Sequence, residues 1–271
     1  MSEESQTQSD ILLYEEKKGV AYITINRPDA RNSLNAEILE RIPKLMKEVD
    51  ENRKIKVVVF RSTGDKAFSG GLDLKWVTSL GGNAISIVWS KATAVSEAII
   101  KSPKIIISSV QASAVGWGTI LFLNSDFRIV ADKPDIFFQL PEVDVGIPAA
   151  TGATLSPIIH LGLEKAKRML LLCEKVNIDF MRDIITKVVP ADKLIEETDN
   201  FAKLIAKHPN SHLMHLTKAA MNVMGQNLVE KFFAIEKECL DYAILAEKPK
   251  ISDFTNELWK KYGNFGPMKL D

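Results

Sequence analysis

The chain has 271 residues, 46% of them hydrophobic and 26% charged, which is the composition of an ordinary soluble globular protein. Its 35 Lys and Arg residues balance its 35 Asp and Glu residues, so the overall charge gives no general attraction to nucleic acid or to an anionic membrane. A chain of this length folds without disulfides or a structural metal, and Cys173 and Cys239 lack the spacing of a Cys-x-x-Cys or zinc motif.

The first ten residues are polar and acidic and show no hydrophobic periodicity, so residues 1–10 are predicted to be a flexible N-terminus. They lack the basic and apolar regions of an export signal and the Arg-rich pattern of a transit signal. No apolar run in the sequence is long enough to span a bilayer. We therefore expect a cytoplasmic protein that does not associate with membranes.

The chain next shows signals for a hairpin and a helix. Residues 11–14 and 20–26 are strand-like runs on either side of a charged turn, which predicts a β-hairpin. From the plausible N-cap Asn35 to Val49, apolar residues recur with the period of a helix. Pro43 lies inside this helix and is predicted to kink it.

Strands and helices then alternate. Residues 55–60 and 104–110 are continuous apolar runs, which are typical of strands covered on both faces. A helix is predicted around residues 83–101, a short buried helix at 116–123, and another strand at 127–130. This order predicts an α/β protein with crossover connections between its strands.

After about residue 190 the strand signals stop. Four helices are predicted, at residues 193–208, 211–225, 228–246 and 253–262. We place the boundary so that residues 11–195 form a core and residues 196–271 a helical C-terminal part. His208, His212 and His215 have no carboxylate set or His-Glu-x-x-His pattern beside them, so we predict no metal site.

Two glycine-containing turns are candidates for ligand binding. Residues 66–75 read Lys-Ala-Phe-Ser-Gly-Gly-Leu-Asp-Leu-Lys, and Asp73 precedes a predicted helix start, where free N–H groups favour negative charge. Residues 115–119 read Val-Gly-Trp-Gly-Thr, which leaves the N–H of Trp117 free to face a ligand. Each turn alone is equally well explained as ordinary packing. Together they supply two N–H groups at the ends of parallel strands, as an oxyanion hole requires.

A single glutamate is the third candidate. Glu142 lies in the apolar segment Leu-Pro-Glu-Val, shortly after Phe137 and Phe138. A lone glutamate is usually a solvated surface residue. An apolar setting, however, raises the pKa of a carboxyl group towards the range in which it transfers protons at neutral pH.

These segments resemble the crotonase superfamily, also called the enoyl-CoA hydratase/isomerase family. The resemblance covers residues 11 to 265. The matching segments are the N-terminal signature at 23–28 and 31–35, the two oxyanion-hole turns at 67–75 and 115–118, the segment of the catalytic glutamate at 140–148, and the C-terminal tail at 259–265.

The resemblance implies an α/β fold whose core, over residues 11–195, is a crotonase-type spiral of repeated ββα units that holds an acyl-CoA site. Residues 196–271 are implied to be a helical oligomerisation region that builds a homotrimer or a dimer of trimers. No cofactor is implied, because CoA is part of the acyl-CoA thioester substrate.

Carried over position by position, the resemblance implies catalytic roles for Glu142 and for the backbone N–H groups of Leu72 and Trp117. It also implies a wider set of residues that contact the substrate, in which the two arginines meet the CoA phosphates. This set is Arg27, Arg31, Ala67, Ser69, Gly70, Gly71, Leu72, Asp73, Leu74, Gly116, Trp117 and Ile120.

Two departures from the family pattern favour one reaction. Hydratases of the family have a second glutamate where this chain has Ile120, and peroxisomal-type isomerases have an acid where it has Ala150. Glu142 alone resembles the pattern of the mitochondrial-type Δ3,Δ2-enoyl-CoA isomerases. We therefore predict Δ3→Δ2 isomerisation of an enoyl-CoA in fatty-acid or related acyl-CoA metabolism.

Three alternatives stay open. In an enoyl-CoA hydratase or a CoA-thioester hydrolase, Glu142 would activate water instead of a carbon acid. A non-catalytic acyl-CoA-binding protein would keep the binding turns and need no acid. Residues 133–135 lengthen the approach to Glu142 relative to the family pattern, so the position of Glu142 in the fold bears on all of these alternatives.

Overall fold

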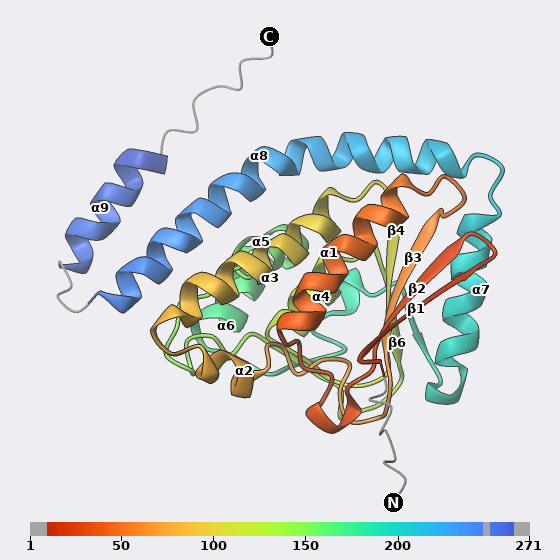
Figure 1. Ribbon diagram of the computed structural model, residues 1–271, viewed down its shortest axis with the longest axis horizontal. Coiled ribbons are helices and arrows are strands. Elements are labelled where there is room, and N and C mark those ends of the chain that lie inside the picture. Colours follow the sequence, from red (N-terminus) through yellow and green to blue (C-terminus); the bar gives the residue numbers. More distant parts are fainter. Residues whose placement is uncertain (1–9, 246–249, 263–271) are drawn as a thin grey trace, which may run out of the picture.

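The computed structural model describes residues 10–245 and 250–262, which form two sheets surrounded by helices (Figure 1). The large sheet has the strand order β1 (Leu12–Lys17), β2 (Val20–Ile25), β3 (Val57–Ser62), β4 (Ile105–Val110), β6 (Phe127–Ala131), β9 (Lys187–Val189). The small sheet has the order β5 (Ala114–Val115), β7 (Phe137–Gln139), β8 (Val176–Asn177). This mixed architecture confirms the predicted α/β class.

Strand pairing follows the sequence signals. β1 and β2 form the predicted antiparallel hairpin, whereas β2, β3, β4, β6 and β9 pair in parallel. Every residue of β2 and β4 is buried. The unalternating apolar runs are therefore explained by helices that cover both faces of the sheet.

Helices lie on both sides of the large sheet. On one side lie α1 (Ala36–Glu51) and α3 (Ala84–Lys101), which contact each other; on the other side α7 (Leu194–Ala206) packs against β2, β3, β4 and β6 (Figure 1). The boundary predicted after residue 195 thus falls inside a helix that covers the sheet. The side chain of Asn35 accepts a hydrogen bond from the N–H of Ile38 (3.1 Å), which confirms it as the N-cap of α1.

Four shorter helices lie in the connections between strands. They are α2 (Leu74–Ser79), α4 (Trp117–Asn124), α5 (Leu155–Leu161) and α6 (Leu163–Leu171). One of them, α4, leads from the small sheet to the large one. Residues 117–123 of α4 are all buried, as predicted for the short helix after the second glycine turn. No helix within residues 10–245 and 250–262 is both long and apolar enough to cross a membrane.

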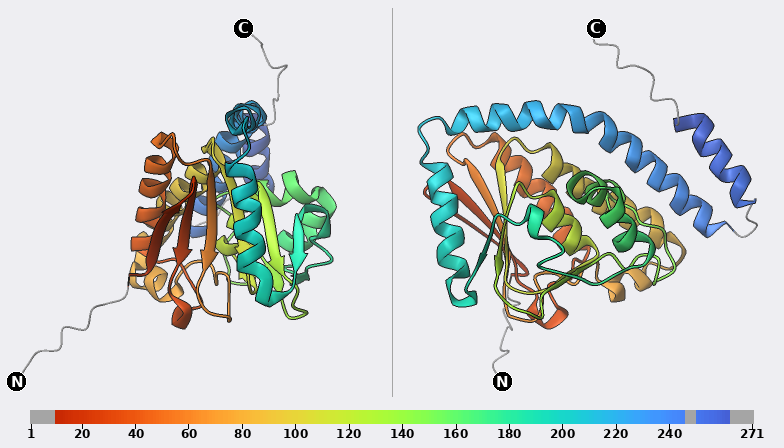
Figure 2. Two further views of the ribbon diagram at one scale, coloured as in Figure 1. Left: turned by 90° about the vertical axis from the view of Figure 1, so that its right-hand side faces the viewer. Right: turned by 180° about the vertical axis from the view of Figure 1, so that it is seen from behind.

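The C-terminal part differs from the prediction of four helices. After α7 come one long helix, α8 (Ser211–Ile244), and α9 (Ile251–Tyr262), which returns beside the second half of α8 (Figure 2). The break predicted between residues 225 and 228 was wrong. A glycine inside a helix costs only about 1 kcal/mol, and contacts with the core hold α8 on both sides of that point.

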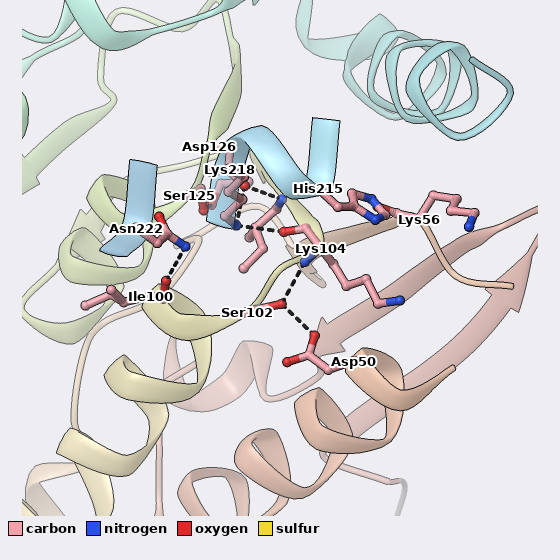
Figure 3. Close-up of polar contacts among 12 residues, drawn as sticks. Asp50, Lys56, Ile100, Ser102, Lys104, Ser125, Asp126, His215, Lys218 and Asn222 are labelled. Atoms are coloured by element: carbon pink, nitrogen blue, oxygen red, sulfur yellow. Dashed lines mark hydrogen bonds and ion pairs between the residues drawn. The ribbon is translucent and has the colours of Figure 1, made fainter. Parts of the chain in front are cut away.

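Polar side chains dock the first half of α8 on the core (Figure 3). They lie at positions 215, 218 and 222, which share one face of the helix. The contacts are Lys218 Nζ to Asp126 Oδ2 (2.7 Å) and to the Lys104 carbonyl (2.7 Å), Asn222 Nδ2 to the Ile100 carbonyl (2.8 Å), and His215 Nε2 to the Lys56 carbonyl (2.9 Å). His215 therefore has a structural contact with the backbone just before β3.

Candidate active site

The first turn leaves the N–H of Leu72 free. The N–H of Leu34 donates to the Gly71 carbonyl (2.8 Å), and the N–H of Asp73 donates to the Leu34 carbonyl (2.9 Å). In this parallel bridge, Leu72 lies between the two bonded residues, so its own N–H points away from Leu34. It has no acceptor in the part of the chain that the structure describes.

The second turn lies directly against the first. Trp117 is the first residue of α4, and its N–H also lacks an acceptor among the described residues. A Cβ atom added to Gly71, which has a φ of +84°, would lie 3.4 Å from the Trp117 nitrogen and 2.8 Å from the Val115 oxygen. Only glycine permits this approach, so the sequence pattern at Gly71 brings the two N–H groups to one place.

Glu142 lies beside these turns, although residues 133–135 are expected to make the segment before it longer than in the family pattern. Its Oε1 is 3.8 Å from the position of a Cβ on Gly116. Its Oε2 is buried and has no hydrogen-bond partner in the described chain. Loss of hydration on burial, with a smaller contribution from the charge of Glu236, raises the pKa of Glu142 to about 7. The apolar setting predicted for this carboxyl group is thus present.

All three groups line one pocket with a volume of about 270 Å³. Ile120 and Ala150, the two positions at which the resemblance implied an acid in other enzymes, line it as well, and Ile120 is only 1% exposed. Among the described residues that line this pocket, Glu142 alone has an ionisable side chain. A larger cavity of about 870 Å³ lies beneath α8, and none of the predicted site residues lines it.

The predicted substrate-contacting set divides into two groups. Seven of its members line the pocket: Gly70, Gly71, Leu72, Leu74, Gly116, Trp117 and Ile120. The other five support the first turn or lie outside the pocket: Arg27, Arg31, Ala67, Ser69 and Asp73.

Arg27 is engaged inside the protein. Its guanidinium donates to the Ser33 carbonyl (2.7 Å) and forms an ion pair with Asp73 (2.9 Å). Asp73 in turn accepts hydrogen bonds from the N–H groups at the start of α2. Arg27 therefore fixes the turn that carries Leu72, whereas Arg31 is exposed.

Sequence reasoning missed several pocket residues from distant segments. Trp89 of α3, Thr151, and Leu240 of α8 all line the pocket. Leu240 is 5% exposed. Trp89 and Leu240 are apolar residues of α3 and α8, but no local signal assigns them, or Thr151, to this pocket.

The chain is similar to known proteins over most of its length. A family model described as "Enoyl-CoA hydratase/isomerase" matches residues 15–257. The chain is 29% identical to the crotonyl-CoA hydratase of Syntrophomonas wolfei subsp. wolfei, with coverage of 94% of this chain and 96% of the relative. It is 27% identical to the short-chain-enoyl-CoA hydratase of Clostridium acetobutylicum, with coverage of 89% and 92%.

A solved structure is similar over the same length. The crystal structure of an enoyl-CoA hydratase/isomerase from Xanthobacter autotrophicus Py2 has a TM-score of 0.78 to this chain, at 28% sequence identity. The match covers 94% of each chain. The chain is thus similar over nearly its whole length to proteins whose names specify enoyl-CoA.

Proposed function

This chain belongs to the enoyl-CoA hydratase/isomerase family of the crotonase superfamily, and we propose that it converts 3-enoyl-CoA thioesters into 2-enoyl-CoA thioesters. The choice of reaction rests on one observation. Among the described residues that line the pocket, only Glu142 has an ionisable side chain. The lining is otherwise mainly apolar, which suits an unsubstituted hydrocarbon acyl group.

The first step removes a proton from the substrate. The thioester oxygen accepts hydrogen bonds from the N–H groups of Leu72 and Trp117, and the carboxylate of Glu142 takes a proton from C2. The electron pair of that C–H bond delocalises over the dienolate and onto the thioester oxygen. Each donor to such an oxygen is typically worth ~10²–10³ in rate.

The second step returns the same proton. The protonated Glu142 donates to C4, the double bond forms between C2 and C3, and the carboxylate is regenerated. A carboxyl group with a pKa of about 7 suits both steps, since it is readily ionised as a base and readily protonated as an acid at neutral pH.

Hydration is the second candidate, because two of the relatives are named as hydratases. Addition of water needs one group to activate water and another to protonate C2. Ile120 offers no proton or hydrogen bond at the position where the family's hydratases have their second glutamate. Losing one positioned acid or base costs ~10²–10⁴ in rate, so we expect hydration to be the slower activity.

Product analysis tests the proposal. The protein is incubated with a 3-enoyl-CoA and, separately, with crotonyl-CoA. Isomerisation is followed by the ultraviolet absorbance of the double bond conjugated with the thioester, and hydration by the mass of the product that has gained water. We expect isomerisation to exceed hydration by at least ~10²-fold. Faster hydration would make the protein a hydratase. A lack of acyl-CoA binding by calorimetry would refute both reactions.

Substitution of Glu142 gives a second test, for which the chain offers a matched control. Glu142→Gln keeps the size of the side chain and should lower isomerisation ~10²–10⁴-fold while acyl-CoA still binds. Glu164→Gln makes the same chemical change on the exposed surface of α6 and should leave the rate unchanged. A near wild-type rate in Glu142→Gln would mean that another group moves the proton.

A further inference from the structure

A second buried glutamate lies next to the pocket without contributing to its lining. Glu236 of α8 is 2% exposed, and none of the ion pairs among the described residues includes it. Its carboxylate accepts hydrogen bonds from the N–H of Gly152 (2.9 Å), the N–H of Thr154 (3.0 Å) and the hydroxyl group of Thr154. All three donors belong to one turn, so Glu236 binds a single short segment of the core.

That turn has an unfavourable backbone conformation. Thr151 has a φ of +60° and Gly152 a φ of +94°, and the left-handed region is costly for a β-branched residue such as threonine. The Thr151 carbonyl accepts a hydrogen bond from the hydroxyl group of Ser96 on α3 (2.7 Å). The turn is therefore held from two sides, by Ser96 and by Glu236.

The same turn forms part of the pocket wall. Ala150 and Thr151 line the pocket, and so does Leu240, one helical turn beyond Glu236. One turn before Glu236, the ring of Phe233 lies 3.3 Å from the position of a Cβ on Gly152. Residues 233, 236 and 240 share one face of α8. This face both holds the turn and closes the pocket.

We propose that Glu236 is a positioning residue for the reaction at Glu142, and that docking of its carboxylate on the turn at residues 150–154 completes the pocket wall. The proposal rests on the function proposed above. It assigns to α8 a part in catalysis in addition to any part in assembly.

The charge of Glu236 also connects it to Glu142, as a positioning residue requires. The charge of Glu236 helps to raise the pKa of Glu142, after the larger effect of burial. Burial also raises the pKa of Glu236 itself, and the hydrogen bonds from Thr154 and Gly152 oppose that rise and favour its carboxylate. Burial raises the pKa of Cys239, and the charges of Glu236 and Glu238 raise it further. Removal of the charge of Glu236 lowers the pKa of Glu142 directly. A looser wall that admits water lowers it further, because hydration favours the ionised carboxylate.

The variant Glu236→Gln tests the proposal with a side chain of the same size. An amide has only one acceptor oxygen, and its NH₂ group would face N–H donors, so it cannot replace the three bonds. We expect kcat/KM for isomerisation to fall ~10- to 100-fold, as small displacements in a site do, and the acid limb of its pH profile to move to lower pH. Glu230→Gln, on the exposed face of the same helix, is the control and should behave as wild type.

A purely structural role predicts a different result. In that case the melting temperature of Glu236→Gln falls, while kcat/KM or the acid limb stays at the wild-type value. Either result would overturn the proposal, as would a variant identical to wild type in every measurement.

Measurements that need no turnover separate this proposal from the proposed function. Hydrogen exchange of residues 150–156 should be faster, and acyl-CoA binding weaker, in Glu236→Gln than in Glu230→Gln. A wild type without isomerase activity would refute the proposed function and leave this comparison valid. If Glu236→Gln does not fold, Thr154→Val removes one of the three donors and should produce the same changes to a smaller extent; unchanged exchange and binding in Thr154→Val overturn the proposal.

Discussion

The carboxyl group of Glu142 is both the proposed proton carrier and a source of instability. Its Oε2 is buried with no hydrogen-bond partner in the described chain, and its pKa is raised from an ordinary value of 4.5 to about 7. Ionisation of this carboxyl group is therefore harder in the folded protein than in the unfolded chain. The same burial that tunes the group for proton transfer makes the folded state less stable once the group is ionised.

This relation predicts how stability depends on pH. The folded protein holds the proton more tightly, so the penalty is absent below about pH 4.5 and grows until the pH exceeds about 7. Glu142→Gln has no ionisable group there, and it should be more stable than wild type by up to about 3 kcal/mol at pH 8. Near pH 4.5 this gain should vanish.

Urea unfolding at the two pH values measures the difference. The exposed Glu164→Gln serves as the control, because its carboxyl group is hydrated in both states. A gain in Glu142→Gln that is the same at both pH values would mean that burial does not raise the pKa of Glu142.

The sequence predicted single residues well where the signal is local. The apolar neighbours of Glu142 predicted its burial, and the glycines around Trp117 predicted its free N–H, because short segments set burial and backbone freedom there. Arg27 shows the limit of this reasoning. The resemblance assigned Arg27 to the CoA phosphates, but its ion pair with Asp73 was not predictable because it links segments that only the fold brings together.

Elements show the same division between local and distant effects. The β1–β2 hairpin and α1 follow from turn, capping and periodicity signals within each segment. The short strands β8 and β9 have too few residues for a periodic signal. The continuity of α8 was also not predictable, since contacts with distant parts of the core outweigh a local glycine.

The contact between the two turns that we propose as an oxyanion hole gives a prediction at the scale of these elements. Gly71→Ala places a Cβ 2.8 Å from the Val115 oxygen and should push the turns apart, with a loss of ~10²-fold or more in kcat, as for removal of one oxyanion donor. Gly81→Ala is the matched control. Gly81 also has a positive φ (+55°), but a Cβ there meets nothing within 4 Å.

The kcat and the melting temperature of both variants test whether the reaction requires the close approach of the two turns. The strain of a left-handed alanine is common to the two substitutions, so both should lose some stability. If Gly71→Ala keeps its kcat, or if Gly81→Ala loses it to the same degree, close approach of the turns is not what the reaction requires.

The docking of α8 has a consequence for the stability of the whole molecule. Lys218 is 8% exposed, and its ion pair with Asp126 joins α8 to the core. Lys218→Met would leave Asp126 with the Ile106 N–H but without its charged partner, and should lower the free energy of unfolding by about 1–3 kcal/mol. The exposed Lys207→Met should change it by less than about 0.5 kcal/mol. Equal effects in chemical denaturation would contradict the assigned role of Lys218.

Assembly is a separate expectation for the whole molecule. Large apolar side chains on α8 remain solvent-exposed, among them Leu216 (64%) and Met221 (70%). Exposed apolar side chains grouped on one element indicate a surface that a partner covers. We expect a homotrimer or a dimer of trimers, to be measured by light scattering at micromolar concentration. A monodisperse monomer would refute this expectation.

The position of Leu240 in the pocket wall also orders events during synthesis. Leu72, Trp117 and Glu142 leave the ribosome well before the second half of α8, because Leu240 follows Glu142 by 98 residues. A nascent chain therefore contains the proposed proton carrier and both proposed N–H donors while the pocket still lacks its wall on the side of α8. Until that helix emerges and docks, we expect the growing polypeptide to bind an acyl chain more weakly than the finished protein.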